Sequence, residues 1–365
     1  MDKKFRIAGI VVAIIVSIVI LTSPSASPPI PPPNFQESEN KTIQIIATHL
    51  EQPWALDFAD DRIFITEKIG KIRVVKSDAM LEEPLASLRT ANIFDGGLLG
   101  IAVHPNFTNN HFLYVYYTYE ENGELWNKIL KITESENKLK DASTILDKIP
   151  GSKFNNGGVI KFGPDHKLYV GTGAGSDSSH DAQNINSLAG KILRLNDDGS
   201  IPSDNPFSNS PVFSYGHSNP SGMAWDKSGS LYVTEMGPSK NDEINLVVGG
   251  ENYGWPEQQC FGDKKFVNAI LCYDPAIEPG GIVYYSGDKL DFKNDMIMAA
   301  MKPGNLDRLK INDGKVEYQK TILSGLGRIR DVNEGPDGYL YIITSNTDGK
   351  AFPDSSDDKL VRILR

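Results

Sequence analysis

The segment GPDHKLYVGTG (residues 163–173) and the shorter segment GKILRL (190–195) that follows it contain the pattern that decides the fold. The first begins with a Gly-Pro-Asp turn and continues into an apolar run of strand-forming residues. In the second, basic residues alternate with apolar ones, which is typical of a half-buried strand. The two segments together predict a turn followed by two β-strands.

The same pair recurs five more times, at intervals of roughly 45 to 65 residues. The other first strands are ADDRIFITE (59–67), NNHFLYVYY (109–117), KSGSLYVTE (227–235), KNDMIMAAM (293–301) and GPDGYLYIITS (335–345). Their partners are GKIRVV (70–75), NKILKI (127–132), DEINLV (242–247), LDRLKI (306–311) and KLVRIL (359–364). Six such units, with almost no amphipathic helical stretch, predict an all-β fold, a six-bladed β-propeller with four-stranded blades. A sandwich or jelly roll would not repeat the pair six times.

A spare strand precedes the first unit, in the segment KTIQIIATHL (41–50). We expect its residues 42–48 to complete the last blade beside KLVRIL, which would close the ring and remove the exposed sheet edges. The sequence therefore predicts one propeller domain over residues 41–365.

The N-terminal segment has the composition of an export signal. Three basic residues, Lys3, Lys4 and Arg6, precede an apolar run from Ile7 to Leu21. The sequence leaves open whether residues 1–22 are a cleaved signal peptide or a helix that anchors the chain in the membrane. Residues 23–40 are rich in Ser and Pro and are expected to form a stiff linker. In both cases we expect an extracytoplasmic propeller, either secreted or tethered to the outer face of the cell membrane.

The overall charge excludes one class of partner. Against 37 Lys and Arg there are 47 Asp and Glu, so the formal net charge is −10. An acidic surface repels phosphate backbones, and nucleic-acid binding is therefore not expected. The membrane is reached only through the N-terminal segment, and the oligomeric state cannot be inferred.

The chain has two cysteines, Cys260 and Cys272, both in the segment CFGDKKFVNAILC. In an exported protein such a pair is expected to form a disulfide. Closing a loop of this length stabilises the folded state by roughly 3 kcal/mol in the chain-entropy model. A metal or redox role is not favoured, because no His or further Cys lies nearby in the sequence.

Polar, glycine-rich loops separate the strands and are expected to gather on one face of the propeller. They include FDGGLLGIAVHP (94–105), FNNGGVIKFGPD (154–165), SYGHSNPSGMAWD (214–226), GPSKNDEIN (237–245), ENYGWP (251–256) and GRIRDVNEGPDG (327–338). In this order the segments resemble the soluble quinoprotein aldose dehydrogenases, the glucose/sorbosone dehydrogenase family, from about residue 45 to the C-terminus. The resemblance implies pyrroloquinoline quinone (PQQ) and calcium at the loop face. It also implies oxidation of a sugar at its C1 hydroxyl, with a histidine as the base.

The chain departs from that family at the base itself. The family's His-x-Gly-Gly motif becomes NNGG, so Asn155 stands at the histidine position. A neutral amide cannot accept the proton. The acid that partners this histidine in some relatives falls on Ala174, so both members of the pair are replaced.

Two further positions differ at the implied cofactor. The arginine of the family's GHRNP is Ser218 in GHSNP, where Asn219 is retained, and the glutamine of GQGG is Asp95. An anionic Asp95 is unfavourable beside a tricarboxylate unless a cation sits between them.

Other cofactor positions match the family. Arg328 and Arg330 in RIRDV fall on the paired arginines that bind the PQQ carboxylates, and alternation along a strand places both on one side. Lys302 in AAMKPGN resembles a further basic contact. Without the family context, such an arginine pair would be read as a solvated strand face.

The resemblance also implies calcium ligands. Glu243 and the carbonyl of Tyr253 match a calcium site of the bacterial relatives, and the carbonyls of Gly237 and Pro238 match the ion that touches the cofactor. Asp242 could instead cap a turn, and Glu243 could be a surface charge.

Two histidines are candidates to replace the missing base. His217 lies in the family motif YGHSNP, and His180 lies on a loop that could overhang the channel. A single loop histidine is more often solvated or structural.

Two classes of function therefore remain open. The first is an extracytoplasmic PQQ-dependent aldose dehydrogenase. The second is a catalytically degenerate propeller that binds a sugar, a glycan or a protein partner. Asn155 favours the second, whereas Arg328, Arg330 and Glu243 favour a ligand site that is still in use.

Overall fold

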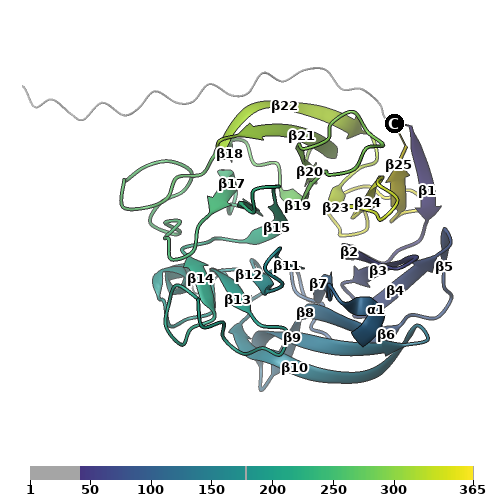
Figure 1. Ribbon diagram of the computed structural model, residues 1–365, viewed down its shortest axis with the longest axis horizontal. Helices are drawn as coiled ribbons and strands as arrows, with labels where there is room; N and C mark the ends of the chain where they lie inside the picture. Colours follow the sequence, from purple (N-terminus) through teal and green to yellow (C-terminus); the bar gives the residue numbers. More distant parts are fainter. Residues whose placement is uncertain (1–41, 177–178, 365) are drawn as a thin grey trace, which may run out of the picture. The chain divides into compact units, whose positions relative to one another are not determined.

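The structure, a computed structural model, describes residues 42–176 and 179–364. These residues form six antiparallel sheets arranged around a common centre (Figure 1). The first strand of each sheet contacts the first strands of the two neighbouring sheets, so these six strands surround the centre. The prediction of an all-β, six-bladed β-propeller is confirmed.

The first three blades follow the chain order. Blade 1 contains β2 (Pro53–Ala59), β3 (Arg62–Glu67), β4 (Lys71–Lys76), β5 (Ala79–Met80) and β6 (Ala86–Ser87). Blade 2 contains β7 (Leu98–Val103), β8 (Phe112–Glu121), β9 (Glu124–Ser135) and β10 (Lys138–Pro150), with the short helix α1 (Phe107–Asn110) between β7 and β8. Blade 3 contains β11 (Gly157–Phe162), β12 (Leu168–Thr172), β13 (Lys191–Leu195) and β14 (Val212–Tyr215), with the 3-10 helix η1 (Ser179–Gln183) between β12 and β13.

The remaining blades repeat this arrangement. Blade 4 contains β15 (Pro220–Trp225), β16 (Leu231–Glu235), β17 (Asp242–Val247) and β18 (Leu271–Tyr273). Blade 5 contains β19 (Pro279–Tyr284), β20 (Met296–Ala300), β21 (Asn305–Asn312) and β22 (Lys315–Ser324). Blade 6 contains β23 (Ile329–Glu334), β24 (Leu340–Thr344), β25 (Leu360–Ile363) and the N-terminal strand β1 (Ile43–Ala47). Blade 1 alone departs from four strands, because β5 and β6 both pair with β4 at its outer edge.

The recurring sequence pair corresponds to the second and third strands of each blade, and its turn has a common structure. In blade 3, Asp165 accepts hydrogen bonds from the backbone of Lys167 at 3.1 Å and from the hydroxyl of Tyr169 at 3.0 Å. In blade 6, Asp337 makes the equivalent bond to the hydroxyl of Tyr341 at 2.9 Å. Through these hydrogen bonds the Asp side chain stabilises the turn and holds the Tyr hydroxyl at the start of the strand.

The inner strands are glycine-rich because they pack closely around the centre. A Cβ on Gly100 would lie 2.1 Å from the carbonyl oxygen of Gly158 in the next blade. A Cβ on Gly280 would lie 2.0 Å from the carbonyl oxygen of Arg330. No side chain fits at these positions, so the Gly-Gly motifs are needed for packing as well as for turns.

The N-terminal strand closes the ring, as predicted. β1 pairs antiparallel with β25, with Ile43 opposite Ile363 and Gln44 opposite Arg362. Figure 1 shows β1 at the outer edge of blade 6, beside β25. Next to it, the buried Leu50 packs in one apolar cluster with residues of blades 1 and 6.

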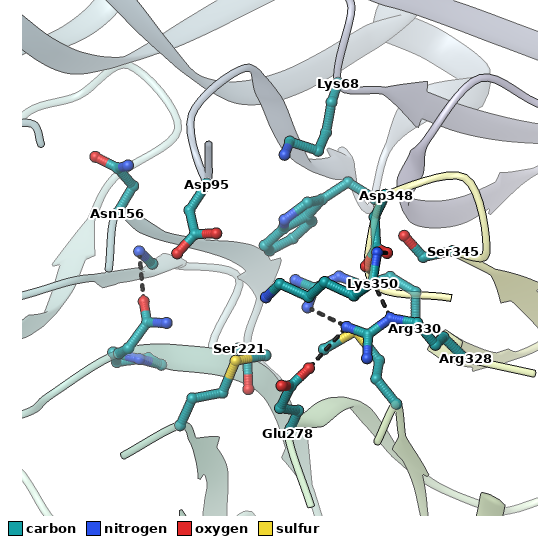
Figure 2. A pocket seen from close by; sticks show the side chains of 16 residues that line it. Lys68, Asp95, Asn156, Ser221, Glu278, Arg328, Arg330, Ser345, Asp348 and Lys350 are labelled. Carbon is teal, nitrogen blue, oxygen red and sulfur yellow. Dashed lines mark hydrogen bonds and ion pairs between the residues drawn. The ribbon is translucent and has the colours of Figure 1, made fainter. Parts of the chain in front are cut away.

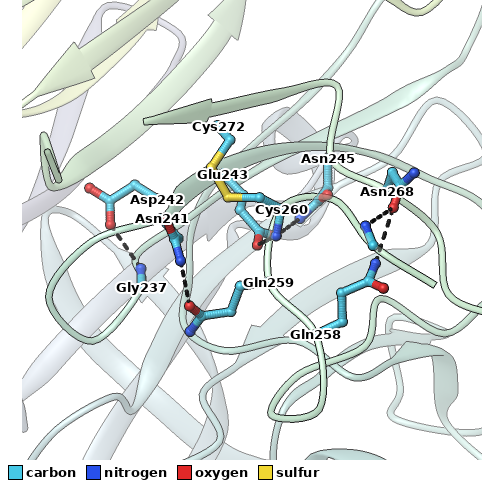
Figure 3. The surroundings of a disulfide bond; sticks show 11 residues. Gly237, Asn241, Asp242, Glu243, Asn245, Gln258, Gln259, Cys260, Asn268 and Cys272 are labelled. Atoms are coloured by element: carbon cyan, nitrogen blue, oxygen red, sulfur yellow. Dashed lines mark hydrogen bonds between the residues drawn. A yellow bond between two sulfur atoms is a disulfide. The ribbon is translucent and has the colours of Figure 1, made fainter. Parts of the chain in front are cut away.

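The disulfide prediction is also confirmed. Cys260 is bonded to Cys272 with a Cα–Cα separation of 5.6 Å, and it fastens the loop after β17 to strand β18 (Figure 3). The predicted signal or anchor (residues 1–22) and linker (23–40) lie outside the described residues. Among the residues that the structure describes, no helix is long and apolar enough to span a membrane.

Candidate functional site

A pocket opens at one end of the central axis, with residues from all six blades in its wall (Figure 2). Its wall is built from residues just before the inner strands and just after the second strands. Antiparallel pairing places these positions at the same end of every blade. Its volume is about 610 Å³, part of which is open to solvent. This channel pocket is defined by the charged residues Lys68, Asp95, Glu278, Arg328, Arg330, Asp348 and Lys350, together with Trp54, Asn156, Asn219 and Met301.

Arg330 is the most unusual of these side chains. Its guanidinium lies over the ring of Trp54 at 4.1 Å, and its Nη1 is 3.7 Å from the sulfur of Met301. Its Nε is buried and has no hydrogen-bond partner in the described part of the chain. Burial lowers the pKa of Arg330 to about 10. A buried cation with an unsatisfied donor is costly unless a ligand completes it.

Arg328 is by contrast paired with two acids. Its Nε donates to Asp348 at 2.8 Å, and its Nη2 donates to Glu278 at 2.7 Å. Burial alone would raise the pKa of Glu278, but the hydrogen bond and charge of Arg328 outweigh it and hold that pKa below its usual value. The two predicted arginines therefore differ in their partners. Arg328 is hydrogen-bonded to two carboxylates, whereas Arg330 lines the pocket and is hydrogen-bonded to no carboxylate of the described residues.

Lys68 and Asp95 lie on the opposite side of the pocket. Lys68 donates from Nζ to the carbonyl oxygen of Phe94 at 2.5 Å. Burial lowers the pKa of Lys68, and the charge of Asp95 partly offsets this shift. The charge of Asp95 also acts on Arg330. The positive charges of Lys68 and Arg330 thus lie within electrostatic range of Asp95. Nearby cations of this kind reduce the repulsion between Asp95 and an anionic cofactor.

Figure 2 shows Asp95, Glu278 and Lys350 entering the pocket from different sides. Four of the charged lining residues are basic and three are acidic. Since Glu278 and Asp348 are paired with Arg328, the acid that remains is Asp95, and the cations that remain are Arg330, Lys68 and the exposed Lys350. The unpaired charges of the pocket are therefore mainly positive, which suits an anionic ligand.

Asn155, which the sequence analysis placed at the family's histidine position, lies at the edge of this pocket. Asn155 has a left-handed backbone (φ 56°), and its amide nitrogen donates to Oδ2 of Asp95 at 3.3 Å. The neighbouring residues Asn156 and Gly157 form the wall, and Gly157 donates to the side chain of Asn219 at 2.9 Å. Asp95 therefore brings a carboxylate next to the backbone of Asn155. Ala174 is buried and bonds through its backbone to Ser218.

Neither candidate histidine is in the channel pocket. His217 is fully buried, with Nδ1 2.6 Å from Glu235, Nε2 2.8 Å from Ser214 and its ring stacked on Tyr253. His180 lies on η1 and is exposed. His217 is therefore a structural residue of the core.

The predicted calcium residues line a second, smaller cavity in blade 4. Its walls include Glu235, Glu243, Tyr253, Gly237 and Ser218. Burial, together with the charge of Glu235, raises the pKa of Glu243 to about 7. Figure 3 shows Glu243 beside the disulfide, where its Oε1 accepts a 2.5 Å hydrogen bond from the backbone of Cys260.

The other calcium positions are more remote from this cavity. Pro238 is exposed. Asp242 caps the local backbone, because it accepts hydrogen bonds from the amides of Gly237, Ile277 and Glu278 at 2.7 to 2.8 Å. Within the described residues, no group of three or more His, Cys, Asp or Glu side chains is arranged to hold a metal ion.

Lys302 lies outside the channel pocket, in a surface groove that adjoins it. The groove shares Glu278, Met301, Arg328 and Lys350 with the pocket, so the two are continuous. Lys302 therefore lies beside the pocket rather than in its wall.

Several lining residues were missed by the sequence analysis, above all Trp54, Lys68, Asp348 and Lys350. Lys68 directly follows the second strand of blade 1, and Asp348 and Lys350 follow the second strand of blade 6. Once the blades are recognised, these positions are predictable from topology alone.

Comparison with known proteins identifies the family. The family described as Glucose / Sorbosone dehydrogenase matches residues 50–353. The chain belongs to this family. Aldose sugar dehydrogenase YliI of Escherichia coli is 29% identical over 338 residues, covering 84% of this chain and 91% of the relative. The structure of a PQQ-bound aldose sugar dehydrogenase from Streptomyces coelicolor matches with a TM-score of 0.80 and 31% identity, covering 90% of this chain and 99% of that one.

The chain is also similar to a protein that is named for binding to another protein rather than for an enzymatic activity. Human Hedgehog-interacting protein is 32% identical over an alignment of 379 positions, gaps included, that covers 88% of this chain and 52% of the relative. The chain is thus similar both to proteins named as sugar dehydrogenases and to one named for an interaction with another protein.

Proposed function

We propose that the chain is an extracytoplasmic aldose dehydrogenase that holds PQQ in the channel pocket and oxidises a sugar at its C1 hydroxyl. The observation that carries this proposal is the buried guanidinium of Arg330, which lies over Trp54 with an unsatisfied donor. A flat aromatic tricarboxylate supplies both the missing acceptor and a surface that packs beside an indole.

The residues of the pocket fit such a cofactor. Arg330, Lys68 and Lys350 would bind its carboxylates, and Arg328 would keep its position through Glu278 and Asp348. When bound, PQQ supplies the acceptor for the two electrons and the hydrogen that leave the sugar carbon. The role of the chain is to hold the sugar against this acceptor, to exclude water and to take the hydroxyl proton.

Asp95 is the residue placed to take that proton. Of the three acidic residues that line the pocket, Asp95 is the one that is not paired with Arg328. Its Oδ2 accepts a hydrogen bond from the backbone of Asn155, the residue that we align with the family's base. A carboxylate is a weaker base than a histidine near neutral pH, so the reaction is expected to be slower than with the family's histidine.

The test separates cofactor binding from chemistry. Titration of the protein with PQQ, followed by calorimetry, should show binding that Arg330→Met abolishes and Asp95→Asn preserves. Aldose oxidation with an artificial electron acceptor should fall about 10²-fold or more in Asp95→Asn. Asn155→His should restore activity to the Asp95→Asn variant. Unchanged oxidation in Asp95→Asn would exclude Asp95 as the base, and absence of PQQ binding would exclude the proposed function.

A calcium ion in the blade 4 cavity is a second part of the proposal. Glu235 and Glu243 are buried close enough to raise the pKa of Glu243, and Oγ of Ser218 and Oε1 of Gln258 are buried there without partners. Oxygen atoms of this kind are the ligands that calcium prefers.

The alternative function is a binding propeller without redox activity. It is favoured by Asn155 and Ala174, which cannot act as the family's base pair, and by the name of the human relative. Under this alternative the wild-type protein would bind a sugar, a glycan or a protein partner on the same face. It would not oxidise aldoses when loaded with PQQ.

A further inference from the structure

Two exposed phenylalanines lie in contact beside the channel pocket. The ring centroids of Phe94 and Phe154 are 4.9 Å apart at an interplanar angle of 50°. The side chains are 60% and 43% exposed, although most large apolar side chains in the described residues are buried. The contact between the rings is favourable, but the apolar area that they leave exposed to water is not. Contiguous exposed apolar surfaces mark binding sites more often than single exposed residues do.

The two rings are held in place by the backbone that carries them. The amide of Asp95 donates to the carbonyl of Lys153 at 3.0 Å, and the amide of Asn155 donates to Asp95 at 3.3 Å. The carbonyl of Phe94 accepts the hydrogen bond from Lys68. The loops of blades 2 and 3 are thus joined directly behind the rings, so the aromatic surface is formed before any ligand binds.

The aromatic pair continues into the polar wall of the pocket. Phe94 directly precedes Asp95, and Phe154 is two residues before Asn156, both of which line the pocket. Two apolar rings, tilted at 50° to each other, therefore lie close in the chain to polar residues of the pocket wall. A pyranose ring has the matching chemistry, since its C–H faces are apolar and slightly positive and its hydroxyls lie around the rim.

We propose that Phe94 and Phe154 form a stacking platform for the pyranose ring of the sugar substrate, with the sugar hydroxyls directed toward Asp95. The platform rests on the proposed function, because the ring that it binds is that of the aldose. It makes the protein selective for cyclic sugars over open-chain polyols that carry the same hydroxyl groups.

The experiment measures binding of glucose and of sorbitol by saturation-transfer NMR and calorimetry, with and without PQQ. The variants are Phe94→Ala, Phe154→Ala, the double variant and Phe154→Tyr. Phe261→Ala is the matched control, because Phe261 is 47% exposed and lies on the disulfide loop. Each alanine should weaken glucose binding about fivefold and the double variant more than tenfold. Phe154→Tyr and Phe261→Ala should bind glucose as the wild type does, and PQQ affinity should be unchanged in all variants.

Three outcomes would overturn the platform: unchanged glucose affinity in the double variant, equal loss of glucose and sorbitol binding, or no glucose binding by a wild-type protein that binds PQQ. Failure of the proposed function gives a different result. If the wild type does not bind PQQ but loses glucose affinity in Phe94→Ala and Phe154→Ala, the platform stands and the redox function does not.

Discussion

Arg328 and Arg330 are separated by one residue on the same edge of blade 6, yet their surroundings assign them different tasks. Arg328 is tied to Glu278 and Asp348, and it therefore holds the wall of the pocket in place. Among the described residues no acid is hydrogen-bonded to Arg330, and its buried Nε has no partner there. A buried charge with an unsatisfied donor lowers the stability of the protein without ligand. Such a side chain is expected where a bound ligand supplies the missing acceptor.

This contrast leads to a prediction for Arg330→Met. Methionine keeps much of the volume and removes a buried charge, so the unfolding free energy of the PQQ-free protein should stay unchanged or rise by up to about 2 kcal/mol. The same change should abolish PQQ binding. Thermal melts with and without PQQ measure both effects. The matched variant Arg328→Met should instead destabilise the protein, because it leaves the half-buried carboxylates of Glu278 and Asp348 without their cation. If Arg330→Met destabilised the protein as much as Arg328→Met, Arg330 would be a structural residue.

At the scale of the elements, the sequence predicts some strands far better than others. The second and third strands of each blade alternate clearly, as β12 and β13 do, and the Asp-to-Tyr contact in the turn adds a fixed spacing. The inner strands carry glycines where the blades meet, as at Gly100 and Gly280, and their pattern therefore resembles that of loops. The outer strands β5 and β6 are two residues each, too short to give any period.

The same reasoning explains which site residues were found. Arg328, Arg330 and Asp95 stand inside motifs with fixed spacing, so the family resemblance identified their positions. Lys68 and Lys350 are single residues that follow a strand end. They reach the pocket because every blade presents that end to the centre, which becomes visible only once the ring is assembled.

A prediction at this scale concerns the closing strand. A chain that starts at residue 49 lacks β1 and leaves the edge of β25 unpaired, whereas a chain that starts at residue 41 keeps it. The first should melt more than about 5 °C below the second, because it loses a strand's hydrogen bonds and the burial of Ile46 and Ala47. Differential scanning calorimetry of the two chains provides the comparison. Equal melting temperatures would show that ring closure by β1 adds nothing to stability.

For the whole molecule, the blade 4 cavity links stability to pH and to calcium. The pKa of Glu243 is about 7 in the folded protein and about 4.5 when unfolded, so the folded state holds its proton more tightly. Without calcium, this group's contribution to stability should be full below about pH 4.5 and should be lost as the pH rises through about 7. Calcium binds the ionised form, and its stabilising effect should therefore grow over the same interval.

Thermal melts from pH 4.5 to 8, with calcium or with a chelator, measure this linkage. Glu243→Gln should remove both the pH dependence assigned to this group and the response to calcium. A calcium response that does not change with pH, or that survives in Glu243→Gln, would place the ion elsewhere.

The pairing of Ile43 with Ile363 also determines when folding can finish. β1 is synthesised well before its partner β25, and at ordinary rates the residues between them take on the order of tens of seconds to be made. Until then the growing protein carries an open sheet edge, the kind of surface on which chains stick to one another. Completion of this ring is therefore a step that follows synthesis, and a chain stopped shortly before β25 should be a substrate for chaperones and proteases.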